Sequence, residues 1–110
     1  MSQQPSKQDV YTKFKRKIEI ESLWLYISKI LRESPKTVSQ IRKELRSEYN
    51  IPVSTITLYT VLYRMEREGL VKRTNDFPIR FQLTPYGGLM YRKSLSLLEE
   101  KLYLLKNGGD

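Results

Sequence analysis

Hydroxyl side chains followed by arginines run along residues 54–67, in an order that suits contact with a polyanion. The hydroxyls are Ser54, Thr55, Thr57 and Thr60, and the arginines that follow are Arg64 and Arg67. Short hydroxyls near the start of a helix can reach the edges of DNA bases, while long cations farther along can reach phosphates. Serine and threonine are permissive readers of bases, so we expect limited direct readout and some reliance on DNA shape.

Two further groups of polar and cationic side chains carry the same chemistry. The first is a strip on one face of a predicted helix, Ser39, Arg42, Lys43 and Arg46, where the absence of acids favours phosphate binding over a merely solvated face. The second belongs to a predicted hairpin, Lys72, Arg73, Asn75 and Arg80, and fits contact with the DNA backbone or minor groove. A basic run at residues 13–17 either is solvated or grips flanking phosphates.

Structural roles compete with these assignments. Ser54 and Thr55 can cap a helix, and Arg64 and Arg67 lie close enough to Glu66 and Glu68 to form a solvated, charge-paired face. Ile56 is expected to pack under the preceding helix rather than to touch a thymine methyl group. Tyr63 is expected to pack rather than to stack on a base. Phe77 is expected to fold back over the hairpin rather than to wedge against DNA or a protein.

Composition narrows the function further. The 110 residues contain 20 Lys and Arg against 12 Asp and Glu, a net charge of +8 that favours polyanions, double-stranded DNA first. There is no cysteine and no histidine, and neither GxxxxGK[ST] nor GxGxxG occurs. We therefore expect no enzyme, no metal site and no cofactor. With no long apolar run and no signal-peptide pattern, we expect a soluble, cytoplasmic, nucleoid-associated protein with no membrane contact.

Apolar periodicity predicts the elements that must position these side chains. Helices are expected from about residue 9 to 18 and over 20–31, 38–49, 54–68 and 85–106, with Trp24 in the core rather than in an effector pocket. A short extended segment is expected at 36–38, and strands at 70–74 and 79–84 flank a turn at 75–78. Thr37 with Gln40 fits a capping box, Asn50 a left-handed cap, and Thr84 with Pro85 a helix start.

The order helix, short strand, helix, turn, helix, hairpin, helix is that of a winged helix-turn-helix. Over about residues 20–106 the chain resembles the PadR-like winged-helix family, through TITLYTVLYRMEREGLVKR followed by FQLTPYGGLMYRKSL. The specific elements are the spacing of Leu62, Met65, Glu66, Gly69 and Leu70, and then Leu83, Thr84 and Gly87. The resemblance implies a mainly α fold with a small β-hairpin wing (α+β), in a small protein of archaeal, viral or plasmid type. It also implies that the third helix enters the major groove, that the wing lies against the backbone or minor groove, and that a C-terminal helix forms a dimer. The chain lacks the long C-terminal helical region of larger members, and the N-terminal helix is expected to compensate at the dimer interface.

The last predicted helix carries a wide apolar stripe. Its heptad seam is Tyr91, Leu95, Leu98, Leu102 and Leu105, and Met90, Leu97 and Leu104 widen it. The stripe either covers the core of its own chain or forms a dimer interface, and we expect a homodimer because an unpaired stripe would expose too much apolar surface. Two reading helices about one duplex turn apart would favour a pseudo-palindromic site.

These inferences define the expected organisation and function. We expect flexible tails at 1–8 and 107–110, a winged-helix DNA-binding domain with an N-terminal helical extension at 9–84, and a dimerisation helix at 85–106. The expected function is that of a homodimeric DNA-binding transcriptional regulator. One alternative is a DNA-organising or centromere-binding partition protein that spreads along DNA by contacts between dimers. Another is a protein interaction module with an incidental basic surface.

Overall fold

The computed structural model describes residues 9–107 of the chain. Its elements are, in order, α1 (Val10–Arg16), the π-helical turn η1 (Lys17–Glu21), α2 (Leu23–Leu31), α3 (Val38–Tyr49), α4 (Thr55–Arg67), β1 (Val71–Arg73), β2 (Phe81–Leu83) and α5 (Pro85–Asn107). The predicted tails at 1–8 and 108–110 lie outside the described residues, and Asn107, predicted to begin the second tail, ends α5.

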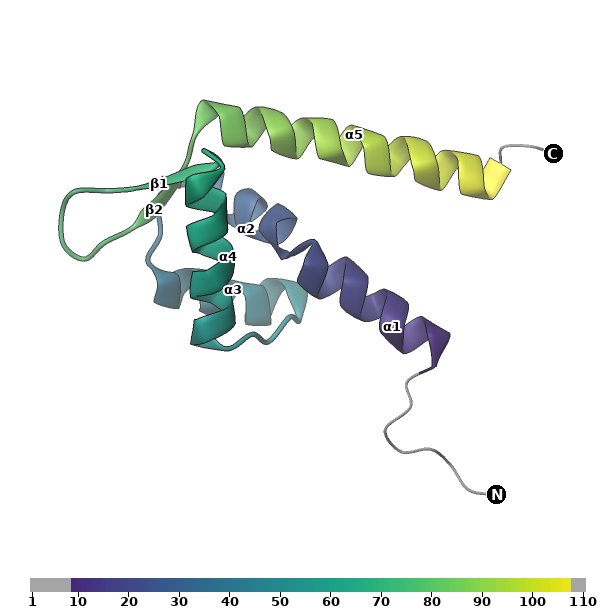
Figure 1. Ribbon diagram of the computed structural model, residues 1–110, viewed down its shortest axis with the longest axis horizontal. Helices are drawn as coiled ribbons and strands as arrows, with labels where there is room; N and C mark the ends of the chain where they lie inside the picture. The colour runs from purple at the N-terminus through teal and green to yellow at the C-terminus, as the bar shows by residue number, and fades with distance from the viewer. Residues whose placement is uncertain (1–8, 108–110) are drawn as a thin grey trace, which may run out of the picture.

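Helices α2, α3 and α4 pack together, and the β1–β2 hairpin extends from them on one side (Figure 1). Helices α1 and α5 project on the other side, one from each end of the chain (Figure 1). The structure is mainly helical with one two-stranded sheet, the winged helix-turn-helix that the resemblance implied. None of the helices in residues 9–107 combines the length and apolar content that a membrane span requires.

Side-chain caps fix the starts of α3 and α4. Thr37 and Gln40 form the predicted capping box, in which Thr37 Oγ1 accepts the Gln40 N–H at 3.1 Å and Gln40 Oε1 accepts the Thr37 N–H at 2.9 Å. Ser54 Oγ accepts the N–H of Thr57 at 3.0 Å at the start of α4. These bonds satisfy N–H groups that find no carbonyl partner in the first turn of a helix. The positions of both helix starts therefore follow from the local sequence.

Left-handed residues turn the chain after α3 and α4. Asn50 has φ 56° and ψ 39°, and Gly69 has φ 80°. Asparagine and glycine are the residues that tolerate this region. The turn at Asn50 directs Ile51 into the core, and Pro52 prevents α3 from continuing. Both helix ends agree with the prediction.

The predicted hairpin is confirmed, with shorter strands. β1 and β2 are antiparallel, and Arg73 pairs with Phe81. An isolated bridge between Lys36 and Phe81 adds the extended segment after α2 to the edge of this sheet. The second strand was expected to begin at residue 79, but Ile79 lies in the loop before β2 and is exposed.

The start of α5 is fastened to the end of α4. Thr84 Oγ1 accepts the N–H of Gly87 at 2.9 Å and donates to the carbonyl oxygen of Gly69 at 2.6 Å. Gly87 lies so close to the preceding chain that a Cβ there would collide with the carbonyl oxygen of Leu70 and with a methyl group of Leu83. The N-terminal turn of α5 therefore needs both the threonine cap and the missing side chain of a glycine.

The core lies between the three central helices and the hairpin. Its fully buried side chains include Leu23 and Ile27 of α2, Leu45 of α3, Leu58 of α4 and Phe81 of β2. Trp24 packs against this cluster, as expected. By contrast, no described part of the chain covers the outer parts of α1 and α5 in this way, and the radius of gyration of 16.6 Å exceeds the value of about 13 Å expected for a compact domain of this length.

Candidate nucleic-acid interface

One long face of α4 is exposed, and the side chains in its first turns are uncharged. Its inner stripe, Leu58, Leu62 and Met65, is buried in the core. The side chains on the opposite face are Thr55, Ile56, Tyr59, Thr60, Tyr63, Arg64 and Arg67. Hydroxyl, apolar and aromatic groups therefore come first, and the cations come in the last two turns. This is the order that the sequence predicted for a helix that contacts both bases and phosphates.

The predicted cations of α3 lie beside the start of α4. A hollow between the two helices is lined by Ser39, Arg42, Lys43 and Arg46 of α3, by Thr55 and Tyr59 of α4, and by Val38, Pro52 and Val53. Arg42 Nε donates to the carbonyl oxygen of Val53 at 2.7 Å, which fixes this arginine against the turn that leads into α4. Three cations and two hydroxyls from the predicted set thus converge on one hollow. Such a set suits an anionic phosphate group.

The other edge of the α4 face meets α2. A second hollow there is lined by Ile56, Thr57, Thr60 and Arg64, together with Ile20 and Trp24 among others. The hydroxyls at this edge have partners within α4: Thr60 Oγ1 donates to the carbonyl oxygen of Ile56 at 3.0 Å, and Thr57 Oγ1 accepts from Ser54 Oγ at 3.0 Å. Thr57 is also half-buried. Base contact by Thr57 stays a prediction. The hydrogen bonds between Thr57 and Ser54 are sufficient to explain a threonine at this position.

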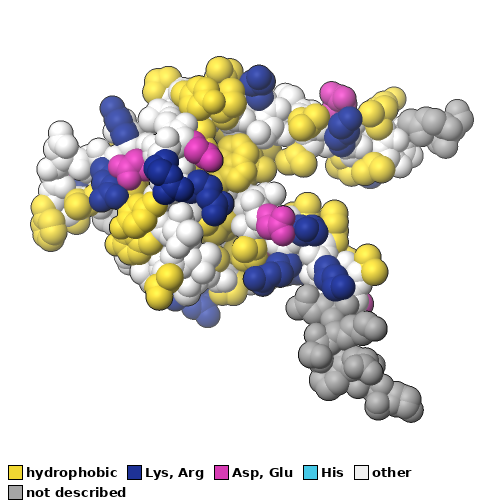
Figure 2. Space-filling view, viewed as in Figure 1, with side chains coloured by type: hydrophobic (Ala, Val, Ile, Leu, Met, Phe, Trp, Pro, Cys, Tyr) yellow, Lys and Arg dark blue, Asp and Glu magenta, His cyan; other side chains and the backbone are white. Residues whose placement is uncertain are grey.

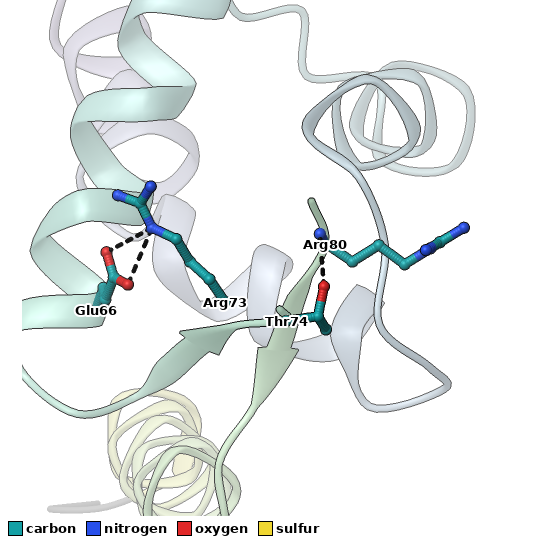
Figure 3. A network of polar contacts seen from close by, with 4 residues as sticks. All are labelled: Glu66, Arg73, Thr74 and Arg80. Carbon is teal, nitrogen blue, oxygen red and sulfur yellow. Dashed lines mark hydrogen bonds and ion pairs between the residues drawn. The ribbon is translucent and has the colours of Figure 1, made fainter. Parts of the chain in front are cut away.

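The hairpin separates its predicted cations into two faces. Lys72 pairs with Gln82 on the face that turns away from the core, and Arg73 pairs with Phe81 on the face that turns toward α4. Arg73 Nε donates to both carboxylate oxygens of Glu66, at 3.0 and 3.1 Å, and its guanidinium lies 5.0 Å from the centre of the Tyr63 ring. Figure 3 shows Arg73 and Glu66 pointing toward one another, while the Arg80 side chain extends the opposite way. DNA contact by Arg73 stays a prediction, since this side chain already has partners within the chain.

Glu66 is the residue that sequence reasoning missed. It was expected near Arg64 or Arg67, but within residues 9–107 no ion pair joins either arginine to an acid. Glu66 lies in the last turn of α4, and its carboxylate pairs instead with Arg73 of β1, across the junction between the two elements. No helical spacing signals such a pair, because it depends on how β1 lies against α4. Figure 2 shows Lys, Arg, Asp and Glu side chains gathered over this junction.

The hairpin tip has its own polar network. Thr74 Oγ1 accepts the N–H of Arg80 at 3.1 Å (Figure 3). The pKa of Asp76 is lowered, first by a hydrogen bond from the Thr74 side chain and also by its own backbone and the Arg80 cation. Asp76 is therefore ionised at neutral pH and offsets part of the charge of Arg80, whose Nη1 lies 4.0 Å from its carboxylate. Lys72 and Asn75 are exposed and remain the outward polar groups of the predicted wing contact.

Two apolar side chains lie where they were not expected. Ile56 is 80% exposed, so the expectation that it packs under α3 was wrong. Its position explains this, because Leu58 and Leu62 already fill the space on the inner side of α4. Phe77 is 92% exposed, so the expectation that it folds back over the hairpin was also wrong. Phe77 lies at the tip, beyond the last backbone bond of the ladder, which joins Thr74 and Arg80.

The predicted dimerisation residues divide into two groups. Tyr91 is only 6% exposed, and its ring lies 5.4 Å from the guanidinium of Arg32, so it packs within its own chain rather than on the open part of the seam. The rest of the seam, Leu95, Leu98, Leu102 and Leu105, is 37%, 49%, 54% and 84% exposed. Exposed apolar side chains also line α1 and η1, including Phe14 of α1 and Ile18 of η1. Figure 2 shows apolar side chains along both projecting helices.

Within residues 9–107 there is no group of three histidine, cysteine, aspartate or glutamate side chains that could hold a metal ion. The hollow between α3 and α4 is lined by cations, hydroxyls and apolar groups, whereas the hollow beside α2 also includes the acid Glu21. The lining of the hollow between α3 and α4 suits an anionic group.

Comparison with known proteins identifies the fold. No family model matches the sequence, and no curated protein matches it either. A solved transcriptional regulator from Clostridium thermocellum superimposes with a TM-score of 0.72 at 18% identity, over 84% of this chain and 98% of the other. A PadR-like transcription factor from Bacteroides fragilis gives 0.68 at 22% identity, over 86% and 96%. A PadR-family transcriptional regulator from Eggerthella lenta gives 0.66 at 23% identity, over 91% and 88%. The chain therefore has the PadR-like winged-helix fold.

Proposed function

We propose that the chain is a homodimeric transcriptional regulator that binds double-stranded DNA, with α4 in the major groove and the hairpin against the backbone or minor groove. The observation that carries the proposal is the hollow in which Arg42, Lys43 and Arg46 lie beside Thr55, at the exposed start of α4. Three solved structures that share the fold, those compared above, are described as transcriptional regulators or transcription factors, and this supports the same role here. The proposed role is binding and not catalysis.

Charge and geometry divide the work between the two helices. The cations of α3 are suited to phosphates, which fix the register of a protein on the duplex but carry no sequence information. Thr55, Ile56 and Thr60 at the start of α4 are then aimed at base edges, since the first residues of a reading helix approach the bases most closely. Arg64 and Arg67 farther along α4 reach phosphates of the same groove. The net charge of +8 adds a long-range attraction to DNA.

The hairpin extends this surface beyond α4. Lys72 and Asn75 are exposed, and Arg80 is half-buried on the same outward side of the sheet as Lys72. A wing with these side chains suits contact with the backbone or the minor groove beside the major groove that α4 occupies. Asp76 limits the positive charge at the tip, so Lys72 is the stronger electrostatic contact of the two cations.

The proposed dimer forms through the exposed seam of α5. Leu95, Leu98 and Leu102 lie on one face, and the described part of the chain offers them no cover. Pairing this face with a second copy buries it, because apolar surface of this extent is otherwise exposed to water. The apolar side chains of α1, which projects on the same side of the molecule, widen the proposed interface (Figure 1). Two copies of α4 would then meet the duplex about one turn apart.

A direct test starts with selection of bound fragments from the source genome, followed by footprinting of the best one. A protected region of constant length supports a regulator at a defined site. Protection that grows along the DNA with protein concentration supports a DNA-organising or partition protein instead. Absence of any protected fragment contradicts the proposal and supports a protein interaction module.

A matched pair of variants tests the hollow between α3 and α4. Arg46→Ala removes a cation that lines it, and Lys29→Ala removes an exposed cation of α2 that does not. We expect Arg46→Ala to weaken binding on all sequences and to reduce the slope of log affinity against log salt by about 1 for each protomer. Lys29→Ala should leave both quantities unchanged. With about six to ten phosphate contacts, wild-type affinity should fall about 10³- to 10⁵-fold between 50 and 200 mM salt, and a flat salt profile would contradict the electrostatic proposal.

A further inference from the structure

Ile56 is a large apolar side chain that the fold does not use. It lies in the first two turns of α4 and is 80% exposed, whereas Leu58, two residues later, is fully buried. Its neighbours on the exposed face are Thr55, which lines the hollow beside α3, and Thr60, which lines the hollow beside α2. Ile56 itself lines the hollow beside α2 together with Thr60, on the part of α4 that faces outward.

The other side chains near the start of α4 cannot distinguish base pairs strongly. Bidentate recognition of adenine uses asparagine or glutamine, and α4 contains neither. Bidentate recognition of guanine uses arginine or lysine, and the first such residue on α4 is Arg64, eight residues after Ile56. The hydroxyls of Ser54 and Thr60 already bond within the helix. The base feature left for the start of α4 is the one that apolar side chains read, the C5-methyl group of thymine.

We infer that Ile56 contacts the methyl group of a thymine in each half-site, an inference that rests on the DNA-binding function proposed above. The branched side chain supplies an apolar surface, and the bound methyl group leaves water. The contact makes an A·T pair the preferred pair at the position that faces the start of α4. It also supplies sequence preference to a helix start that otherwise carries only hydroxyl and aromatic groups.

Replacement of thymine by deoxyuridine tests this contact, because it removes only the methyl group. The footprinted duplex is synthesised with uracil at one symmetric pair of thymines at a time, and dissociation constants of the full chain are measured by fluorescence anisotropy. At one pair of positions the wild type should lose about fourfold in affinity for each half-site, or about 16-fold in total, the loss expected for one methyl group no longer buried. Uracil elsewhere should have little effect.

Two variants separate Ile56 from other exposed isoleucines. Ile56→Ala should bind the thymine and uracil duplexes equally, and it should keep the wild-type melting temperature because the side chain is not in the core. Ile79→Ala removes an isoleucine that is exposed beside the hairpin tip and should keep the full wild-type discrimination. The pair therefore controls for a general loss of apolar surface.

The outcomes distinguish this inference from the proposed function. A wild-type chain that binds its site but is indifferent to uracil at every position overturns the inference and leaves DNA binding intact. An Ile56→Ala variant that still loses affinity on uracil substitution at the wild-type position also overturns it. A wild-type chain that binds no genomic duplex overturns both.

Discussion

Helices α4 and α5 both carry a stripe of large apolar side chains, yet only one stripe is covered. In α4 the stripe of Leu58, Leu62 and Met65 packs into the core. In α5 only the first turns reach the core, through Gly87, Gly88 and Tyr91, and the leucines that follow are exposed. Both segments show helical periodicity, so periodicity alone does not say which stripe will be buried.

The two helices therefore differ in the side chains that their exposed faces carry. Because α4 buries its apolar stripe within the chain, its outer face can carry hydroxyls, Ile56 and arginines. Because α5 does not, its free apolar face is the larger feature, and in the proposed function a second copy covers it. The apolar stripe of one helix is therefore buried in the core, whereas the apolar stripe of the other stays exposed and is available for the proposed partner. The predictions below test that contrast, from the largest expected effect to the smallest.

A charge on the exposed seam of α5 should have the largest effect. Leu98→Arg is expected to prevent dimer formation and to lower DNA affinity about 100-fold or more, because two linked half-sites bind far more tightly than one. The folding of the single chain should not change, since Leu98 is half exposed. Sedimentation at micromolar concentration and fluorescence anisotropy measure the two effects. Ser96→Arg places the same charge on α5 away from the seam and should leave both unchanged, and a Leu98→Arg variant with wild-type binding would contradict the proposed geometry.

A methyl group at the anchored end of α5 should destabilise the fold. Gly87→Ala drives a Cβ into the carbonyl oxygen of Leu70, and we expect a loss of roughly 1–3 kcal/mol in the free energy of unfolding. Gly88→Ala is the matched control, because a Cβ there would meet the Arg92 and Leu83 side chains at ordinary contact distances of 3.5 and 3.9 Å. Alanine is the better helix former, so Gly88→Ala should be neutral or stabilising. Equal effects of the two substitutions in urea titrations would show that the close approach at Gly87 is unimportant.

Removal of the cap of α4 should have a smaller effect. Ser54→Ala removes the oxygen that accepts the Thr57 N–H, and a loss of about 1 kcal/mol in the free energy of unfolding is expected. Thr55→Ala, one residue later, removes a hydroxyl that does not cap and should cost less. Chemical denaturation of both variants gives the comparison. A larger loss in the free energy of unfolding for Thr55→Ala than for Ser54→Ala would contradict the capping role of Ser54.

Release of Arg73 should have the smallest effect. Its pair with Glu66 is partly exposed, so Glu66→Gln should lower the free energy of unfolding by less than about 1 kcal/mol. The same change removes a negative charge beside α4 and frees an arginine, so DNA affinity should rise slightly at low salt. Anisotropy titrations at two salt concentrations measure this. A clear loss of affinity would mean that the Glu66–Arg73 pair holds the hairpin in its binding position.

Sequence reasoning predicted well wherever a local rule applies. The capping box of Thr37 and Gln40, the left-handed Asn50, and the Thr84–Pro85 start of α5 each depend on a few neighbouring residues, and each agrees with the structure. The cations of α3 were also assigned to one face, and three of them line one hollow. These features need only the helical repeat and short-range hydrogen bonds.

The errors arise where the outcome depends on packing between distant segments. Ile56 and Phe77 were assigned to packed positions because large apolar side chains are usually buried, but Leu58 and Leu62 already fill the space inside α4, and the hairpin ladder ends before Phe77. The Glu66–Arg73 pair depends on how β1 lies against α4. The strands came out shorter than the alternation suggested because pairing stops at the hairpin tip. None of these follows from spacing along the chain.

The hydroxyl of Thr84 joins the turn after α4 to the start of the projecting helix α5. It donates to the carbonyl oxygen of Gly69 and accepts from Gly87, so the tilt of α5 relative to α4 is set within a few bonds of one residue. With 23 residues, α5 is about 34 Å long, and a tilt of about 10° at its base would move its far end by about 6 Å. In the proposed dimer that displacement is comparable to the rise of nearly two base pairs. If the proposed dimer forms, the spacing between half-sites would therefore depend on the hydrogen bonds of this threonine.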